Sequence, residues 1–159
     1  TAMGGMFWYA SSFNQDLSSW DVSSLQYINY LFAGASQFNQ DLSSWNLGNV
    51  IRMHGMFWGA SSFNQDISNW DVSSAQTMSR MFWEASSFDQ DLSSWDVSSA
   101  TEMWNMFRDA SSFNQDLCAW GSKLSSSIST ADAFLGASSC DSQDDPNLSL
   151  SPPGPFCHV

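Results

Sequence analysis

The sequence predicts an α/β solenoid, with parallel strands on one face, short helices on the other and a divergent cap at the carboxyl end. Two observations predict it. First, the ten-residue motif FNQDLSSWDV at Phe13–Val22 recurs with a period of 25 residues as far as Phe113. Second, the hydrophobic spacing within each repeat changes from the period of a strand to that of a helix. A fixed repeat of this length is typical of stacked coils, because one repeat alone cannot close a hydrophobic core.

The first half of each repeat is predicted to be a strand. Leu42, Trp45 and Leu47 have the L-x-x-L-x-L spacing of a leucine-rich repeat, with tryptophan in the middle. The alternation of Trp45 and Leu47 suits a strand that has one buried face. We therefore expect parallel, leucine-rich-repeat-like strands near residues 19–22, 44–47, 69–72 and 94–97.

The second half of each repeat is predicted to be a short helix. Met53, Met56, Phe57 and Ala60 are spaced i, i+3, i+4 and i+7, which places them on one face of a helix. Equivalent residues recur in the neighbouring repeats. We therefore expect helices near residues 26–33, 51–58, 76–83 and 101–108.

Polar residues also recur in columns. In the asparagine column, we expect each side chain to bond to the backbone of the neighbouring coil. In the first aspartate column, carboxylates about 5 Å apart would repel each other. Divalent cations such as calcium could bind between the coils. The favoured interpretation is that each carboxylate accepts a backbone N–H at its turn or points to water, because the aspartate sits in a bend and no calcium-binding motif is present. The columns are Asn14, Asn39, Asn64 and Asn114, with Asp89 in the fourth place, and Asp16, Asp41, Asp66, Asp91 and Asp116.

The chain divides into a repeat array at residues 1–117 and a cap with a proline-rich tail at residues 118–159. The array contains a partial first unit, four full units and the start of a fifth. Because Thr1 already lies inside a repeat, we expect a leader or further repeats before it. An uncapped first coil would also favour head-to-tail contacts between copies of the chain.

The cap contains all three cysteines. We expect a disulfide between Cys118 and Cys140, which would lie on neighbouring coils, with Cys140–Cys157 as the rival pairing. A zinc site that uses the cysteines and His158 is a weaker alternative, since the spacings match no compact zinc motif. Asn147 begins an N-x-S sequon in the tail and is a candidate for glycosylation.

The composition excludes several classes of function. Sixteen acidic residues against four Lys and Arg give a net charge of −12, which argues against nucleic-acid binding and against attraction to anionic membranes. No apolar run approaches the roughly 20 residues of a membrane span. The serine-rich, lysine-poor composition suits an extracellular or cell-surface protein.

Nothing in the sequence indicates an enzyme or a cofactor. The two histidines are His54 and His158, and neither belongs to a catalytic motif of the H-E-x-x-H or Ser-His-Asp type. The sequence also has no glycine-rich phosphate loop. We therefore expect a non-catalytic protein that binds no cofactor.

The repeated FNQDLSSWDV motif, followed by M-x-x-M-F, resembles the BspA-like leucine-rich repeat family. These are surface proteins of bacteria, mycoplasmas and some algae and protists. The resemblance covers residues 1–137 and is strongest at Phe63–Val72, Met78, Met81 and Phe82. It implies a secreted or surface-anchored array that serves adhesion or protein–protein contacts, and it implies no catalytic residue.

Two surfaces are candidates for such contacts. Tryptophans outside the core pattern, at Trp8, Trp58, Trp83 and Trp104, would either form an intermolecular contact patch or cover neighbouring turns of their own layer. The alternative is a sensor module in which the polar strand face binds a ligand or carbohydrate, through Asp21, Asn46, Asp71 and Asp96. The expected partners are other protein chains, copies of this chain, or glycans.

Overall fold

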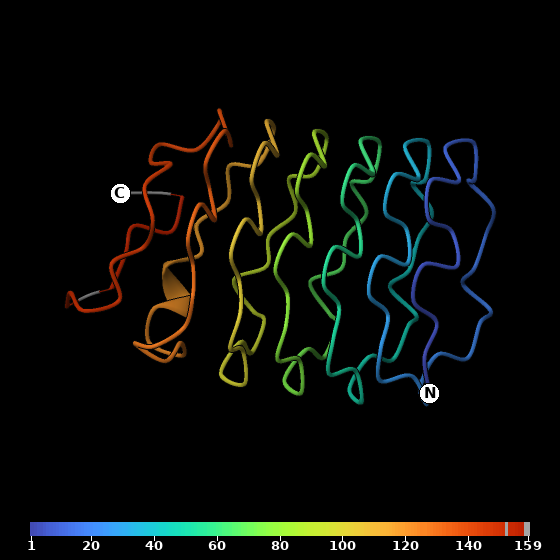
Figure 1. Ribbon diagram of the computed structural model, residues 1–159, viewed down its shortest axis with the longest axis horizontal. Helices are drawn as coiled ribbons and strands as arrows, with labels where there is room; N and C mark the ends of the chain where they lie inside the picture. The colour runs from blue at the N-terminus through green and yellow to red at the C-terminus, as the bar shows by residue number, and fades with distance from the viewer. Residues whose placement is uncertain (152, 158–159) are drawn as a thin grey trace.

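The structure, a computed structural model, describes residues 1–151 and 153–157. The chain winds into a stack of coils, one coil to each 25-residue repeat, which stand side by side along the long axis (Figure 1). The first coil lies at one end of the stack and the cap at the other. Each coil is bonded to the next by backbone hydrogen bonds between residues about one repeat apart, such as Met3 N–H to the Tyr27 carbonyl at 2.9 Å.

The predicted α/β solenoid is wrong. Among the described residues, the only helix is the short 3₁₀-helix η1, Cys118–Trp120, and no strand is present. Pairing of the β type between coils is confined to isolated parallel bridges. The bridges join one row of residues down the stack, namely Ala2, Tyr27, Arg52, Thr77, Glu102 and Ser129.

The expected helices are replaced by a chain of tight turns. Gly55 and Gly59 have φ values of +61° and +66°, a left-handed conformation that interrupts a right-handed helix. Met53 N–H donates to the Thr77 carbonyl of the next coil at 3.0 Å, and every second residue as far as Gly59 repeats this bond. Met56 N–H instead reaches back only to the Met53 carbonyl, at 3.2 Å. Some backbone N–H groups therefore bond to the next coil, and the others close turns by bonding to the carbonyl three residues earlier in the same coil.

The hydrophobic face that suggested a helix is nevertheless buried as expected. Met53, Met56, Phe57 and Ala60 are all fully buried. Consecutive tight turns return the chain to the same side every three or four residues, much as a helix does. The spacing therefore identified the buried side correctly but not the hydrogen bonding that produces it.

The expected strands are also absent, although the alternation is real. Trp45 and Leu47 are buried and Asn46 is exposed. Trp45 donates its backbone N–H to the Leu42 carbonyl of its own coil at 3.0 Å, which is a turn. Its indole N–H donates to the Leu17 carbonyl of the preceding coil at 3.1 Å. A side chain thus makes the link between coils that a sheet would make with its backbone.

Two columns of stacked phenylalanines run through the core. The ring centroid of Phe57 lies 5.7 Å from that of Phe82 in the next coil and 3.9 Å from that of Phe63 in its own coil. Each fully buried ring contributes about 2–3 kcal/mol. The columns tie each coil to its neighbours and comprise Phe7, Phe32, Phe57, Phe82, Phe107 and Phe134, and Phe13, Phe38, Phe63, Phe88 and Phe113.

The cap is closed by a disulfide between Cys140 and Cys157, whose Cα atoms lie 4.9 Å apart. The preferred pairing, Cys118–Cys140, is therefore wrong, and the rival pairing is the one present. Cys140 occupies the buried phenylalanine position of its coil, whereas Cys118 occupies an exposed serine position and is a free thiol. Two positions on neighbouring coils are close only when they also lie at the same place around the coil. His158 of the alternative zinc site lies outside the described residues, as does Pro152 of the tail.

Candidate interaction surface

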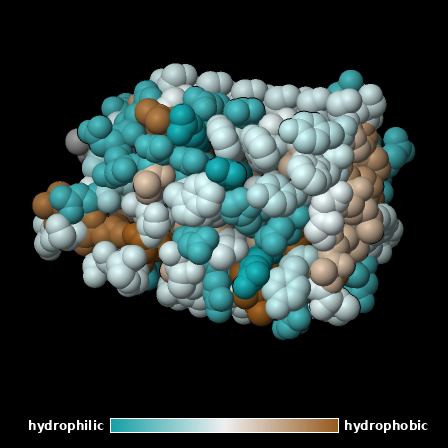
Figure 2. Space-filling view, viewed as in Figure 1, coloured by the Kyte–Doolittle hydropathy of each residue, from teal (hydrophilic) through white to brown (hydrophobic). Residues whose placement is uncertain are grey.

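The tight turns of the second half of each repeat carry an aromatic surface. We call it the aromatic face and define it by Trp8, Tyr30, His54, Trp58, Trp83 and Trp104. Trp8, Trp58 and Trp83 occupy the same position in different coils, and this position holds Ala33 and Arg108 in others. Seen from one side, the molecular surface is largely hydrophilic to neutral, with apolar patches toward its two ends (Figure 2).

The rings of the aromatic face contact one another from coil to coil. Trp58 and Trp83 are stacked, with centroids 5.1 Å apart and planes 11° from parallel. Tyr30 lies between Trp8 and Trp58, at 5.7 Å and 6.4 Å respectively. Trp8 is 54% exposed, whereas Trp58, Trp83 and Trp104 are partly buried. The tryptophans therefore cover neighbouring turns, as one interpretation predicted, and still present ring surface to solvent.

Two arginines lie on these rings. The guanidinium carbon of Arg80 is 4.5 Å from the ring centroid of Trp104 and 5.0 Å from that of Trp83. The guanidinium of Arg108 is 5.8 Å from Trp83. A cation at such a distance over an indole is attracted by the electron-rich face of the ring, by about 0.5–2 kcal/mol depending on its exposure.

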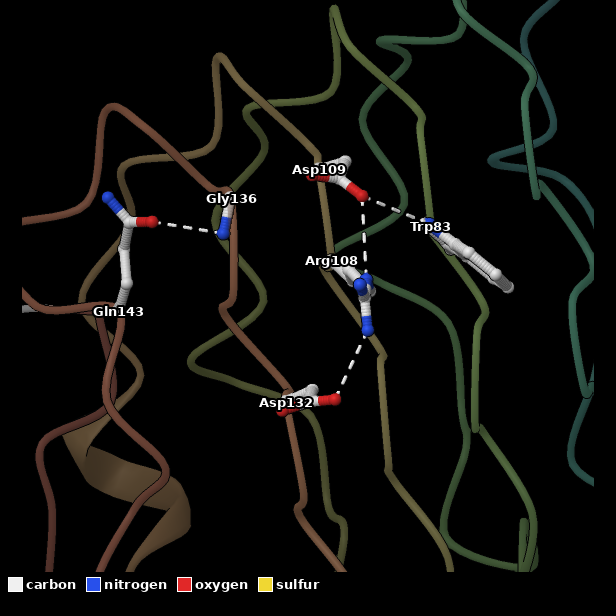
Figure 3. A network of polar contacts seen from close by, with 6 residues as sticks. All are labelled: Trp83, Arg108, Asp109, Asp132, Gly136 and Gln143. Atoms are coloured by element: carbon white, nitrogen blue, oxygen red, sulfur yellow. Dashed lines mark hydrogen bonds and ion pairs between the residues drawn. The ribbon is translucent and has the colours of Figure 1, made fainter.

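A polar network extends this cluster to the cap (Figure 3). The Trp83 indole N–H donates to Asp109 at 3.3 Å, and Arg108 Nη1 donates to Asp132 of the next coil at 3.1 Å. Arg108 Nε lies 3.5 Å from Asp109, an ion pair rather than a well-formed hydrogen bond. Trp83 and Arg108 are therefore held in place by groups on the following coils.

His54 lies at the centre of the aromatic face. Its ring contacts Tyr30 edge-on at 5.1 Å and Trp104 at 5.4 Å. Trp104 is two coils away, and it reaches His54 because the intervening residue, Ser79, is small and fully buried. Burial lowers the pKa of His54, and the nearby charge of Arg80 lowers it further, against an opposing effect of Glu102.

Two hollows border the aromatic face. The first, which we call the aromatic groove, has a volume of about 240 Å³. It is lined by Trp8, Tyr9 and Trp58, floored by Ala33, Gly34 and Gly59, and edged by Glu84. The second is polar, measures about 300 Å³ and lies among Asn29, Arg52, His54, Thr77 and Glu102. Only the first combines several aromatic walls with a carboxylate.

The first aspartate column makes the local bonds that were favoured over calcium. Asp41 accepts the backbone N–H of Ser43, two residues on, at 2.8 Å. This backbone bond lowers the pKa of Asp41, while the charges of Asp16 and Asp66 in the neighbouring coils act to raise it. The same turn recurs at Asp16, Asp66, Asp91 and Asp116. Among residues 1–151 and 153–157, no group of three or more His, Cys, Asp or Glu is arranged to hold a metal ion.

The column proposed as a polar strand face is built from similar turns. The carboxylate of Asp71 accepts both the hydroxyl and the backbone N–H of Ser73, at 2.6 Å and 3.0 Å, and these bonds lower the pKa of Asp71. Asp21 makes the same pair of bonds to Ser23. Asn46 and Asp96 accept the corresponding backbone N–H. One carboxylate oxygen of each aspartate is therefore already engaged within its own coil.

The predicted asparagine ladder is confirmed. The Asn39 side-chain oxygen accepts the backbone N–H of Asn64 at 2.9 Å, and Asn64 in turn accepts that of Asp89 at 2.9 Å. Asn147, the glycosylation candidate, is exposed in the tail, where its side-chain oxygen accepts the N–H and hydroxyl of Ser149. Its modification stays a prediction.

Sequence reasoning missed Tyr9, Tyr30, Arg80 and Glu84 as parts of the surface. Their side chains reach the aromatic face because their backbones adopt positive φ values of 55–60°. A helix would have pointed them elsewhere. Aligning the repeats position by position would have given the one available signal, since these residues replace glycines of other coils.

Comparison with known protein families gives a match over most of the chain. A family model described as "Mycoplasma protein of unknown function, DUF285" matches residues 1–82 and, in a second overlapping placement, residues 43–145. No curated protein and no solved structure matches the chain.

Proposed function

The chain belongs to the DUF285 family, and we propose that it is a non-catalytic, extracellular module that makes protein–protein contacts at a cell surface. The contacts would be adhesive, to other surface proteins, or would assemble copies of this chain. We further place it among the BspA-like surface repeat proteins, because the motif at Phe13–Val22 and its repeats resemble theirs.

The observation that carries this proposal is the aromatic face. Residues that dominate binding at protein interfaces are enriched in tryptophan, tyrosine and arginine. The face contains tryptophan and tyrosine, and Arg80 lies on its rings. The rings are held rigid by stacking, so little side-chain entropy would be lost when a partner covers them. A net charge of −12 opposes contact between two like chains unless cations or glycans intervene, which favours a partner that carries positive charge.

The first experiment tests the interface. In Trp58→Ala, one ring of the stacked Trp58–Trp83 pair is lost, and we expect association to weaken about tenfold or more. The matched controls are Asp71→Asn and Asp96→Asn, which alter the polar column and should leave association unchanged. If instead these two variants abolish binding to a ligand while Trp58→Ala does not, the alternative of a ligand- or carbohydrate-binding sensor is correct.

The second experiment tests self-assembly and location. Light scattering on the purified protein, with and without a chelator, reports whether copies of the chain associate, and a stable monomer under both conditions rules self-assembly out. Protease treatment of intact cells of the native organism should remove the protein if it is displayed outside. Full protection of the protein in intact cells, with cleavage after lysis, would contradict the extracellular location.

A further inference from the structure

The aromatic groove exists because three small residues interrupt columns of large ones. Ala33 stands where Trp8, Trp58 and Trp83 stand in other coils. Gly34 and Gly59 occupy positive-φ positions that carry Tyr9 and Glu84 in the coils on either side. The Tyr9 ring leans over Gly34, where an added Cβ would overlap it, while Gly59 has no side-chain atom in its immediate contact shell. The result is a hollow above Gly59 with ring walls.

The same surface shows what such walls bind. In the coil that also carries Glu84, Arg80 places its guanidinium over the rings of Trp83 and Trp104, at 5.0 Å and 4.5 Å. The cation on these rings is therefore a residue of the chain itself. The aromatic groove has comparable walls in Trp8, Tyr9 and Trp58, and the described residues that line it include no Arg, Lys or His.

Glu84 provides the charge that a cation requires. It lies at the edge of the groove, is exposed and makes no ion pair among those found in the described part of the chain. A carboxylate beside electron-rich rings attracts cations that are large and weakly hydrated, such as guanidinium, because these lose little hydration on stacking. The overall charge of −12 adds to the attraction.

From this geometry we infer that the aromatic groove binds the guanidinium group of an arginine side chain presented by a partner protein. The group lies in the hollow over Gly59, against the rings of Tyr9 and Trp58, and pairs with Glu84. The inference rests on the proposed protein-contact function. It specifies that the surface of the partner carries an exposed arginine.

The probe for this site is N-acetyl-arginine-N-methylamide, whose only charge is the guanidinium. Its neutral counterpart, N-acetyl-citrulline-N-methylamide, has nearly the same shape. Binding is followed by NMR through the indole N–H signals, assigned with single Trp→Phe variants. We expect the arginine compound to shift the Trp8 and Trp58 signals with a Kd on the order of millimolar, and the citrulline compound to bind at least about fivefold more weakly.

Matched variants separate charge from shape. Glu84→Gln should weaken binding of the arginine compound by about five- to tenfold, whereas Glu102→Gln, the same change beside the polar hollow, should have no effect. Both substitutions are at exposed residues, so the fold is retained and the comparison does not depend on a ring deletion. Equal shifts from the citrulline compound, an unchanged affinity in Glu84→Gln, or shifts produced by methyl glucoside but not by the arginine compound would each overturn the inference.

The arginine site and the proposed protein-contact function can be disproved separately. If the arginine compound binds and the chain makes no protein contact on the cell surface, the site is real and the function is wrong. If Trp58→Ala abolishes association but the arginine compound does not bind, the protein-contact function stands without this chemistry.

Discussion

Asn14, Asn39 and Asn64 each hold the next coil by a side-chain oxygen. Each accepts the backbone N–H of the equivalent residue in the following coil, at 2.9 Å in every case. Each such hydrogen bond contributes about 0.5–1.5 kcal/mol, so a polar residue is favoured wherever the chain bends at this point. Asp89, in the fourth place, performs the same task for Asn114 and also accepts the Gln115 amide at 2.8 Å.

A pair of substitutions at Asp89 measures this bond. Asp89→Ala removes the acceptor for two donors and should lower the free energy of unfolding by about 1–2 kcal/mol. Asp89→Asn keeps an oxygen in the same place, as the other coils do, and should stay within about 0.5 kcal/mol of the parent. Urea denaturation measures both. Equal stability of the two variants would mean that the ladder does not support the stack.

His54 gives the aromatic face a dependence on pH. Its pKa is lowered from the ordinary histidine value of 6.5, chiefly by burial and then by Arg80, so the unfolded chain takes up a proton before the folded chain does. Stability from this residue is therefore intact above about pH 6.5 and is lost as the pH falls from there toward the lowered pKa. We expect the difference in unfolding free energy between the parent and His54→Gln to shrink over this window. A difference that is constant from pH 7.5 to 5 would contradict it.

At the scale of the element, the unit of this fold is a row of tight turns that share hydrogen bonds with the next coil. It contains recurrent left-handed residues, at Gly55 and Gly59 in one coil and Arg80 and Glu84 in the next. Non-glycine residues accept this conformation at a cost of about 1–2 kcal/mol each. The bonds to the neighbouring coil and the burial of the phenylalanines offset that cost, so the turns form only within the stack.

Alanine substitutions at Gly55 and Gly59 distinguish the turns from a helix, because the change in stability has the opposite sign in the two structures. At Gly55, an added Cβ would lie 2.7 Å from the Tyr30 ring, and we expect Gly55→Ala to destabilise the chain by about 2–3 kcal/mol. At Gly59, the nearest atom would be 3.7 Å away, so Gly59→Ala should cost only about 1 kcal/mol. In a helix both changes would stabilise by about 1 kcal/mol. Thermal unfolding of the two variants decides between these outcomes, and any gain in stability contradicts the turns.

At the scale of the whole molecule, the stack concentrates negative charge. Repeating an aspartate in every coil places like charges in neighbouring coils, and the charges of Asp16 and Asp66 both act on Asp41. With a net charge of −12, the folded state carries a repulsion that the more expanded unfolded chain partly relieves. The local bonds of each carboxylate position it but do not neutralise it.

Added salt should therefore stabilise the stack. Raising NaCl from about 20 mM to 500 mM shortens the Debye length from roughly 20 Å to roughly 4 Å, and we expect the free energy of unfolding to rise by about 1 kcal/mol. Calcium chloride at equal ionic strength should add little, because the described aspartates are not arranged as a metal site. Urea denaturation in the two salts makes the comparison. A stabilisation by calcium far beyond that of NaCl would show that the first aspartate column binds the ion.

The sequence by itself determined the period, the buried residues and the roles of the polar columns. These follow from spacing, because a repeated coil places equivalent residues at equivalent positions whatever its secondary structure. Phe57, Met53 and Met56 are buried, the asparagines form a ladder and the aspartates bond within their own bends. The sequence also identified Trp8, Trp58, Trp83 and Trp104 as tryptophans that lie outside the core pattern.

Only the tertiary structure decided the hydrogen bonding, and with it the secondary structure and the surface. Spacing at i, i+3, i+4 and i+7 is shared by a helix and by consecutive turns, and the choice depends on whether the backbone N–H groups bond within a coil or to the next one. The left-handed residues that result direct Tyr9, Tyr30 and Arg80 onto the aromatic face. The structure also settled the disulfide, because the path of the tail that brings Cys157 to Cys140 lies outside the repeat pattern. Which backbone N–H groups bond within a coil and which bond to the next coil is a property of the folded stack, and the spacing of residues along the chain does not contain it.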